Sequence, residues 1–533
     1  MAAKLHKQAQ KKSEAPGREI VGNFLEYLTV FLTALLVLIL PLALKNGYYK
    51  VGDFKFQIYF YLLNAGMAVL VPLSLVYFFL GLKSMSWKQR WQDLSLTDRM
   101  VLFYLLATLL SFFVNSAYMK SNFMGYSGWY MGLYAQLTFG FLYYIMSRFG
   151  KDYRIVLFLL AAASLIAYLF GILHRLNIDP IHTYDGLDAF YRNRFLSTLG
   201  QASWYSGFLC SFLPFVMGVY LTTQRLWLRI ASGIFCFVGF MTLVTQNSDS
   251  AYFAITAVFL VLLYGAVSDA LRLLRLLELF GGLLLAARMM QLLFHIHPNP
   301  ELELDQISLF LIHGSLPWAV LALVAALWAL FWVLHKKERY QPRPMVLIRN
   351  GIYVLALLFI AAMVLILVLG ARGAFSPAMM QRLEKLPYLV WTDQWGNARG
   401  FTWSVCWRMI REFAPLALLL GVGPDGFASY GYEHYAQLIR TQWGDMVLTN
   451  AHNEWMTMVI DGGLVGAVLY AGIFLTQLAR LLKRAAQKPY LVAFAACIGS
   501  YMAHNLFCYQ DVLCTPFLFL LMGCAEWELR HTE

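Results

Sequence analysis

The sequence predicts an all-α, polytopic membrane protein with about 14 transmembrane helices and one large extracytoplasmic loop subdomain of short helices. Two observations lead to this fold class. The 533 residues are 60% hydrophobic and only 13% charged, whereas an ordinary soluble domain carries roughly 25% charged residues. In addition, apolar runs of membrane-spanning length recur along the chain, and lipid leaves their backbone groups no partners outside their own helix. Together these exclude a soluble enzyme, a disordered chain and a fibrous protein.

The runs divide the chain into a charged tail, a long first group of spans, a polar segment and a short last group. The weakest runs are 274–295, which contains Arg288, and the short final run. The predicted spans are 22–44, 57–82, 98–117, 129–148, 153–173, 202–222, 227–245, 250–267, 274–295, 312–334, 347–370, 454–478, 488–507 and 512–527.

Basic residues orient the predicted spans. Lys and Arg accumulate in cytoplasmic loops, and 335–349 is the most basic loop, whereas 296–311 contains three acidic residues and no Lys or Arg. This places both termini in the cytoplasm, with the tail 1–21 (Lys4, Lys7, Lys11, Lys12 and Arg18) on the same side. The net charge of +12 is then explained by topology and anionic lipid, and no nucleic-acid partner is expected.

The domain organisation follows from these spans. Residues 22–370 form the first eleven spans, 371–453 an extracytoplasmic subdomain, and 454–533 the last three spans with a short cytoplasmic tail. A connection of about 80 residues is usually functional. Its tryptophans are interpreted as interfacial anchors, with sugar stacking by one of them as the alternative; they are Trp391, Trp395, Trp403, Trp407 and Trp443.

The strongest polar cluster, 450–466, begins where this subdomain re-enters the membrane. It contains Asn450-Ala451-His452-Asn453-Glu454 and then Asp461-Gly462-Gly463-Leu464-Val465-Gly466. The imidazole of His452 is the natural proton acceptor at neutral pH. Asn453 could bind a sugar hydroxyl, and Glu454 would point away from His452 on a helix. The alternative is a polar helix start, with Asn450 or Asn453 as its cap.

Three further candidates carry charge. Arg399, in Gly396-Asn397-Ala398-Arg399-Gly400, has the planar cationic fork that suits a diphosphate. Arg194 precedes the span at 202 and is a second candidate phosphate ligand, or part of an ordinary helix start. Asp249 lies in the hairpin 246–250. It is either a functional acid at the membrane surface or part of a simple turn.

One motif is misleading. Gly421-Val422-Gly423-Pro424-Asp425-Gly426 matches the dinucleotide-binding pattern, but no strand precedes it and no βαβ unit surrounds it, which excludes a Rossmann fold. Gly423 and its neighbours are instead expected to shape a tight turn before Phe427.

In this order, the clusters resemble the O-antigen ligase family and its relatives, the O-antigen polymerases and protein O-oligosaccharyltransferases. The resemblance extends over about 190–527, with 274–334 as an extra helix pair. It is carried by Arg194-x-x-Ser197-Thr198-x-Gly200, Arg399…Trp403, GVGPDGF at 421–427, His452-Asn453-Glu454 and Gly463…Gly466, and the Gly125…Gly132 stretch fits it as well.

The resemblance implies a GT-C-type membrane glycosyltransferase, without metal or other cofactor, in the bacterial cytoplasmic (inner) membrane. Such enzymes move a glycan from undecaprenyl diphosphate to a hydroxyl of a lipid, glycan or protein acceptor on the outer side. Carried over, His452 would be the catalytic base, and Arg399 with Arg194 would hold the diphosphate. Gly423, Asn453 and Glu454 would contribute to substrate binding.

One departure from the family pattern affects this reading. The hairpin arginine of the ligases is replaced by Asp249, which would repel a diphosphate unless it pairs with Arg399 or His452. The alternatives are a polysaccharide polymerase of the same family, a flippase of lipid-linked glycans and an inactive scaffold. A flippase would show charges at mid-membrane and paired broken spans, which the sequence lacks, whereas Asp249 is the one feature that favours the scaffold.

Overall fold

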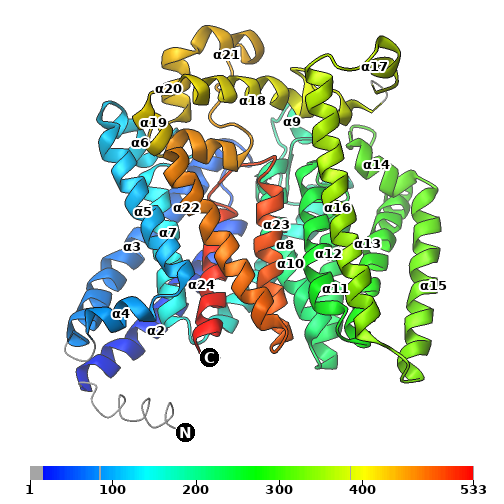
Figure 1. Cartoon of the computed structure of the whole chain (residues 1–533), viewed down its shortest axis with the longest axis horizontal. Coiled ribbons are helices and arrows are strands. Elements are labelled where there is room, and N and C mark those ends of the chain that lie inside the picture. Colours follow the sequence, from blue (N-terminus) through cyan, green and yellow to red (C-terminus); the bar gives the residue numbers. More distant parts are fainter. Residues whose placement is uncertain (1–15, 83–85, 384–385, 532–533) are drawn as a thin grey trace.

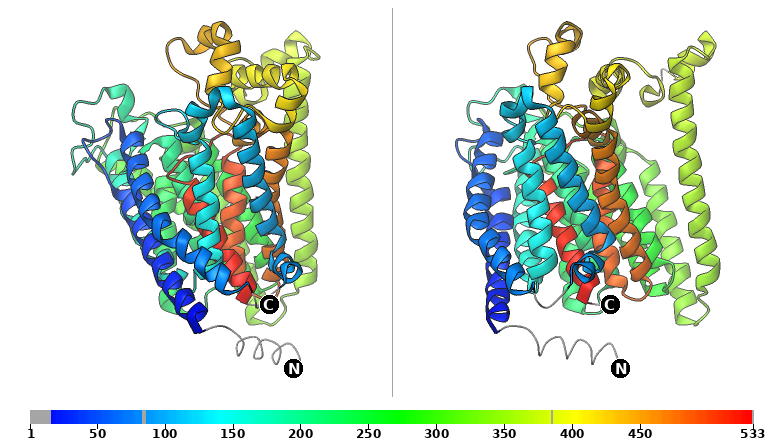
Figure 2. Two further views of the ribbon diagram at one scale, coloured as in Figure 1. Left: turned by 90° about the vertical axis from the view of Figure 1, so that its left-hand side faces the viewer. Right: turned by 60° about the vertical axis from the view of Figure 1, so that its left-hand side comes forward.

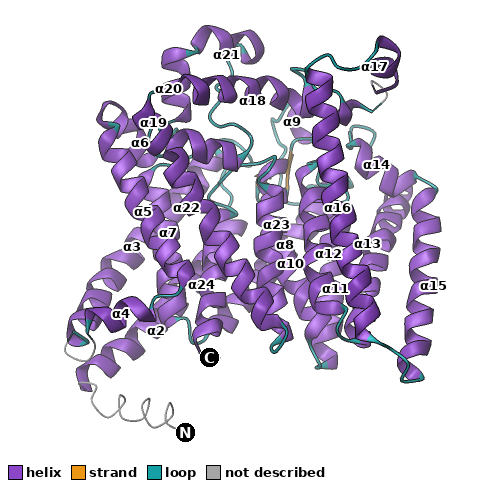
Figure 3. Ribbon diagram, viewed as in Figure 1, coloured by secondary structure: helices purple, strands orange, loops and turns teal. Residues whose placement is uncertain are grey.

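In the computed structural model, which describes residues 16–82, 86–383 and 386–531, long helices stand side by side and short helices lie across one end of the bundle (Figure 1). We call this the upper end, as drawn in Figure 1. Among the described residues the only strands are β1 (Phe195–Leu196) and β2 (Gly200–Gln201), which pair antiparallel (Figure 3). The predicted all-α, polytopic fold class is confirmed.

The described bundle contains one helix for each predicted span. These helices are α2 (Pro16–Leu42), α3 (Val51–Leu80), α5 (Leu96–Val114), α7 (Leu133–Phe149), α8 (Tyr153–Arg175), α10 (Ala202–Thr222), α11 (Leu226–Leu243), α12 (Ser250–Ala266), α13 (Ala270–Ile296), α15 (Leu316–Lys336), α16 (Pro342–Ala371), α22 (Glu454–Ala485), α23 (Val492–His504) and α24 (Thr515–His531).

Nine of these helices, counted over the described residues, are long and apolar enough to cross a membrane. They are α2, α3, α5, α8, α10, α11, α15, α16 and α22. Of the other five, α7, α12, α23 and α24 are shorter than these, and α13 carries several charged residues. The predicted number of about 14 therefore holds for the helices of the bundle, while nine of them meet the stricter length and composition requirement.

Short helices and turns make the connections. They are α4 (Trp87–Asp93), η1 (Ser116–Tyr118), α6 (Met119–Met124), α9 (Ala189–Arg192), α14 (Gln306–His313), α17 (Pro377–Leu383), η2 (Pro387–Leu389), α18 (Trp395–Glu412), α19 (Pro415–Leu420), α20 (Phe427–His434), α21 (Ala436–Trp443) and η3 (Pro489–Leu491). Those between α16 and α22 form the layer at the upper end, with a small core of their own that includes Cys406, Met409, Phe427 and Ile439.

Local sequence explains several of the helix ends. Pro415 begins α19, and two residues separate it from the end of α18; its fixed φ and missing N–H suit a first helical turn. Asn453 caps α22 by accepting a hydrogen bond from the backbone N–H of Met456 at 3.0 Å. At the other end of the chain α2 already begins at Pro16, six residues before the predicted span, and the lysines of the predicted tail at positions 4–12 lie outside the described residues.

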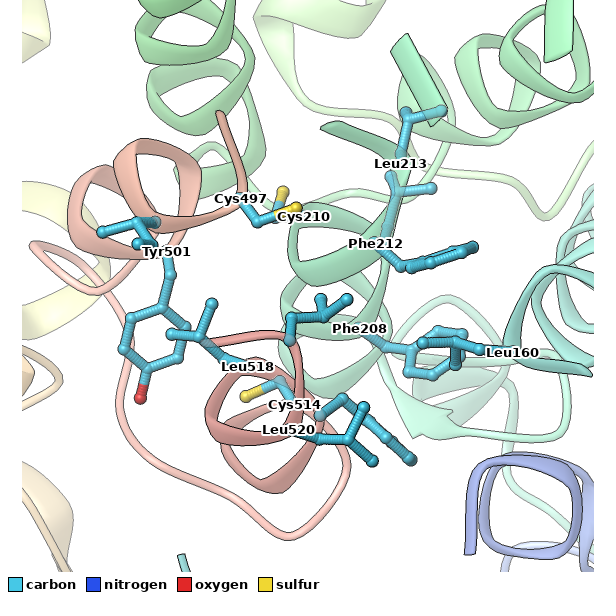
Figure 4. Close-up of a cluster of buried hydrophobic side chains, with 14 of the residues drawn as sticks. Leu160, Phe208, Cys210, Phe212, Leu213, Cys497, Tyr501, Cys514, Leu518 and Leu520 are labelled. Atoms are coloured by element: carbon cyan, nitrogen blue, oxygen red, sulfur yellow. The ribbon is translucent and has the colours of Figure 1, made fainter. Parts of the chain in front are cut away.

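The main core sits where α10, α23 and α24 meet. Figure 4 shows side chains of all three helices in this core: Phe208 and Cys210 of α10, Cys497 and Tyr501 of α23, and Leu518 and Leu520 of α24. All seven cysteines are buried and free. By contrast, α16 runs along the edge of the bundle (Figure 2), and none of its residues is buried, as expected of a helix that faces lipid.

The charge in the weakest predicted span is accommodated by its neighbours. Arg288 of α13 donates hydrogen bonds to the carbonyl oxygens of Ile312 (2.6 Å) and Gly314 (2.8 Å) at the end of α14, and it lies over the ring of Trp318. These contacts give its guanidinium partners that lipid could not provide.

Candidate functional site

His452 lies at the upper end of the bundle, two residues before α22 begins. Its backbone is left-handed, with φ at 48°, and its N–H donates to the side-chain oxygen of Asn450 at 2.8 Å. The imidazole lies parallel to the indole of Trp443, with 6.1 Å between ring centroids, and edge-on to Tyr509 at 5.3 Å. Its ring nitrogens make no hydrogen bond within the described ranges and are available to a ligand.

Arg399 lies just after a sharp turn at the start of α18. Gly396, Asn397 and Ala398 all have positive φ, and this turn lets the guanidinium reach back to donate to the carbonyl of Gly396 at 2.5 Å. A second nitrogen donates to the carbonyl of Phe507, in the loop between α23 and α24, at 2.7 Å. The Nε atom is buried and has no hydrogen-bond partner among the residues described.

Contacts around Trp403 bring these two side chains into one region. Trp403, one helical turn beyond Arg399, donates its indole N–H to the carbonyl of Ala451 at 3.0 Å and stacks on Phe507. Burial and the nearby positive charge of Arg399 lower the pKa of His452 to about 3, so its imidazole is neutral at physiological pH. The structure therefore places the predicted base and the predicted diphosphate ligand within electrostatic reach of each other.

Asp249 borders the same region at the start of α12. One carboxylate oxygen accepts a hydrogen bond from the hydroxyl of Tyr388 at 3.1 Å, while the other is buried and unpaired among the described residues. Burial, followed by the charge of Asp305, raises the pKa of Asp249, and the Tyr388 hydroxyl and the Arg399 charge partly offset this. In the described part of the chain Asp249 forms no ion pair with Arg399 or His452, so neither of the pairings considered from the sequence is formed.

The remaining predicted site residues have structural surroundings. Asn453 is the cap of α22, which is the plainer of its two interpretations. Glu454 is buried in the bundle, where it accepts hydrogen bonds from Tyr470, Tyr501 and Asn505.

Gly423 and Arg194 differ in their surroundings. Gly423 has φ at 99°, and a Cβ there would overlap the amide of Asn122, so it serves the tight turn that the sequence predicts. Arg194 is exposed just before β1 and is not among the residues that line the cavity described next.

A cavity lined by Asn450 and Tyr509, which both contact His452, holds three carboxyl groups, those of Asp425, Glu454 and Asp461. Like Arg194, the side chains of His452 and Arg399 are not among those that line it. Its walls come from α5, α7, α22 and the loops at 129–131, 424–425 and 509–510. The lining residues are Tyr104, Thr108, Ser111, Trp129, Met131, Gln136, Pro424, Asp425, Asn450, Glu454, Thr457, Met458, Asp461, Gly462, Tyr509 and Gln510.

Asp425 is a cavity residue that sequence reasoning did not select. Its carboxylate accepts hydrogen bonds from the backbone N–H groups of Tyr126 (2.7 Å) and Met131 (3.3 Å), and burial raises its pKa to about 7. A Cβ on Gly125, where φ is 90°, would overlap this carboxylate. The Gly125…Gly132 stretch was therefore the sequence signal for this contact, although it did not identify Asp425 as the partner of Gly125.

Asp461 belongs to the polar cluster 450–466 but was given no role from the sequence, and two glutamines were missed. The carboxylate of Asp461 accepts a hydrogen bond from the N–H of Phe427 at 2.9 Å, which joins α22 to α20. Gln136 of α7 accepts from Tyr104 at 2.8 Å and donates to Gln510 at 2.7 Å. Neither glutamine belongs to a motif recognised in the sequence, so only its spatial neighbours reveal the network.

In the described part of the chain, no group of three or more His, Cys, Asp or Glu side chains is arranged to hold a metal ion. The cationic group at the site is Arg399, which suits an anionic ligand.

Residues 306–471 match the family model described as O-antigen ligase. This part of the chain is similar to the O-antigen ligase family. The match includes Arg399, Gly423, His452 and the α18–α21 layer, whereas Arg194 and Asp249 precede it. It covers part of the family-like region expected at about 190–527, and it overlaps the pair 274–334 that was expected to be an insertion. A comparison with curated proteins found no match.

Proposed function

We propose that this O-antigen ligase-like protein is a metal-independent, inverting glycosyltransferase. It would move a glycan from undecaprenyl diphosphate to an acceptor hydroxyl on the outer side of the cytoplasmic membrane. The observation that carries the proposal is that Trp403, on the helix of Arg399, bonds the carbonyl next to His452 and so brings the guanidinium and the imidazole into one region, inside the matched residues and at one end of a membrane bundle.

The chemistry assigns one task to each of these side chains. A ring nitrogen of His452 takes the proton of the acceptor hydroxyl as its oxygen bonds to the anomeric carbon. The bond from that carbon to the diphosphate oxygen breaks, and Arg399 stabilises the charge that develops on the leaving diphosphate. A single displacement of this kind inverts the anomeric centre.

Donor binding would also activate the base. The positive charge of Arg399 contributes to the low pKa of His452. A bound diphosphate would offset that charge and raise the pKa of the imidazole, so that it becomes a stronger proton acceptor when the donor is in place.

The orientation of the bundle suits this reaction. The start of α2 and the end of α24 lie at the lower end, opposite the α18–α21 layer (Figure 1). If the lower end is cytoplasmic, as the basic loop 335–349 indicates, the site opens on the side where a lipid-linked donor presents its glycan. The tail of such a donor would stay in lipid, and the bundle and the upper layer would align the two substrates.

The decisive experiment is transfer by a purified His452→Ala variant, with the undecaprenyl-linked glycan fraction of the source cells as donor. We expect the rate to fall about 100-fold or more, in the range of general base catalysis, with donor binding retained. His434→Ala, which changes an exposed histidine of α20, is the matched control and should transfer normally. Undiminished transfer by the His452 variant would remove this residue from the mechanism. A wild-type protein that binds the donor without turnover would instead be a scaffold.

A further inference from the structure

Unused hydrogen-bonding atoms lie in the region of His452 and Arg399. Within the described residues, the Nε atom of Arg399, one carboxylate oxygen of Asp249 and the indole nitrogen of Trp443 are all enclosed and unpaired. Leaving buried polar atoms unpaired is unfavourable, and native proteins do so rarely. Arg399 and Trp443 are neighbours of the unbonded imidazole, and Asp249 is a neighbour of Arg399. Unpaired atoms on these three residues indicate that a ligand completes their hydrogen bonds. Arg399 and Asp249 already have individual roles assigned or debated, whereas Trp443 has only the general interpretation shared by the five tryptophans of the 371–453 segment.

Trp443 differs from the tryptophans around it. Trp403 donates its N–H to the carbonyl of Ala451, and Trp395 donates to that of Tyr388, both at 3.0 Å. The N–H of Trp443 has no such carbonyl among the described residues, although the residue is well placed. It ends α21, packs on the core of the upper layer and holds its ring parallel to the imidazole of His452.

We propose that Trp443 contacts the substrate directly, with its indole N–H donating a hydrogen bond to an oxygen of the sugar that binds against His452. This rests on the proposed glycosyl transfer. An indole offers a flat apolar face and one polar N–H at its edge, which matches the alternating C–H and oxygen surface of a sugar ring. The sugar could belong to the donor or to the acceptor, and both present the same hydroxyl and ring oxygens.

The substitution Trp443→Phe tests this contact because it keeps an aromatic ring against His452 and removes the N–H. We expect kcat/KM to fall about 3- to 10-fold, the effect of one neutral hydrogen bond, with Tm within about 2 °C of the wild type. Trp407→Phe, at an exposed position of α18, is the control and should change neither quantity. A rise confined to the donor KM assigns the sugar to the donor, and one confined to the acceptor KM assigns it to the acceptor.

Two outcomes would overturn the proposal. Wild-type kinetics in the Trp443→Phe variant would show that the N–H is idle. A large loss of Tm, with activity recovered at lower temperature, would show that the N–H only stabilises the fold.

A second measurement does not depend on turnover. In protein labelled with 5-fluorotryptophan, the fluorine resonance missing from the Trp443→Phe variant identifies Trp443. We expect it to shift when the undecaprenyl-linked glycan fraction or the acceptor is added, and a resonance unmoved by both would contradict the contact. If His452→Ala retains transfer, the proposed function fails, yet this shift would still report sugar binding at Trp443.

Discussion

The two side chains at the centre of the site are each held by an unusual backbone. His452 has a left-handed φ, as do Asn397 and Ala398 immediately before Arg399. Such conformations are costly for residues other than glycine and persist where the surrounding structure enforces them, often at functional sites. Here the Asn450 side chain fixes the turn at His452, and the carbonyl of Phe507 anchors the guanidinium.

At the residue scale, Arg399→Gln should raise the pKa of His452 from its value of about 3. Removing a nearby positive charge makes protonation of the imidazole less unfavourable. The imidazole titration can be followed by NMR in histidine-labelled protein, with His452→Gln used to identify the resonance. Arg399→Lys keeps the charge and should leave the titration low, and inorganic diphosphate added to the wild type should move it upward. An unchanged titration in Arg399→Gln would mean that the two groups are not coupled.

The pH dependence of stability should show two opposing contributions at this site. The pKa of His452 is lowered to about 3 in the folded protein. Its contribution to folding stability is therefore fully present above the pKa of about 6.5 that histidine has in the unfolded chain, and it is lost as pH falls from there towards 3. Burial raises the pKa of Asp425 to about 7. Its contribution to folding stability is therefore fully present below pH 3.8, the ordinary pKa of an aspartate, and it is lost as pH rises towards 7.

Variants can separate these two contributions. His452→Gln should therefore reduce the loss of Tm between pH 7.5 and 5, whereas Asp425→Asn should stabilise the protein more at pH 7.5 than at pH 5. Thermal unfolding at both pH values measures this. Parallel pH profiles for wild type and both variants would contradict the assignment.

At the scale of elements, α22 is positioned by close contact between two glycine-containing turns. Gly463 interrupts α22 with φ at 66°, and a Cβ there would overlap the carbonyl of Leu419. A Cβ on Gly421 would overlap the backbone carbonyl of Asp461. The GVGPDGF turn and the kink of α22 therefore fit together only because neither carries a side chain, and this places Asp425 and Asp461 at the same cavity.

The substitution Gly463→Ala should lower the free energy of unfolding by about 1–3 kcal/mol, since it adds a side chain at a positive φ and against backbone. Gly466→Ala is the matched control on the same helix, because a Cβ at Gly466 meets nothing within 4 Å. It should be neutral or slightly stabilising, as alanine favours helix. Denaturant unfolding in detergent measures both, and equal effects would show that the kink is not under steric constraint.

At the scale of the whole molecule, ion pairs lock the lower end of the bundle, far from the site. Arg480 of α22 and Glu526 of α24 are 2.6 Å apart, and Arg530 of α24 pairs with Asp98 of α5. Glu526 is fully buried and Asp98 nearly so. The first pair joins α22 to α24, and the second joins α24 to α5 from the first part of the chain, so together they fix the frame on which the upper end is built.

Glu526→Gln should therefore lower the free energy of unfolding by about 3 kcal/mol, because it leaves Arg480 without its buried partner. Asp93→Asn alters a mostly exposed partner of the same cluster and should cost less than about 1 kcal/mol. Chemical unfolding in detergent distinguishes the two. A Glu526 variant as stable as the control would mean that this pair does not hold the lower end together.

Several features could be predicted because they depend on short-range chemistry. Every predicted run contains a helix, since lipid forces an apolar run to satisfy its own backbone. The cap at Asn453 and the turn around Gly423 follow from local hydrogen bonds and glycine conformation. Other features could not be predicted in this way. The start of α2 at Pro16 lay before the apolar signal, and the partner of Gly125 lies some 300 residues away.

The amino-acid order alone settles that the protein is a helical membrane bundle with a polar layer between α16 and α22, because hydropathy and helix length are properties of contiguous residues. The tertiary structure decides which polar residues meet. Arg399 comes close to His452 only because Phe507 and Trp403 join three separate segments. Likewise, Trp443 lies against His452, and Asp425 lies near Asp461. Residue spacing along the chain does not predict these contacts, because they depend on how distant helices pack.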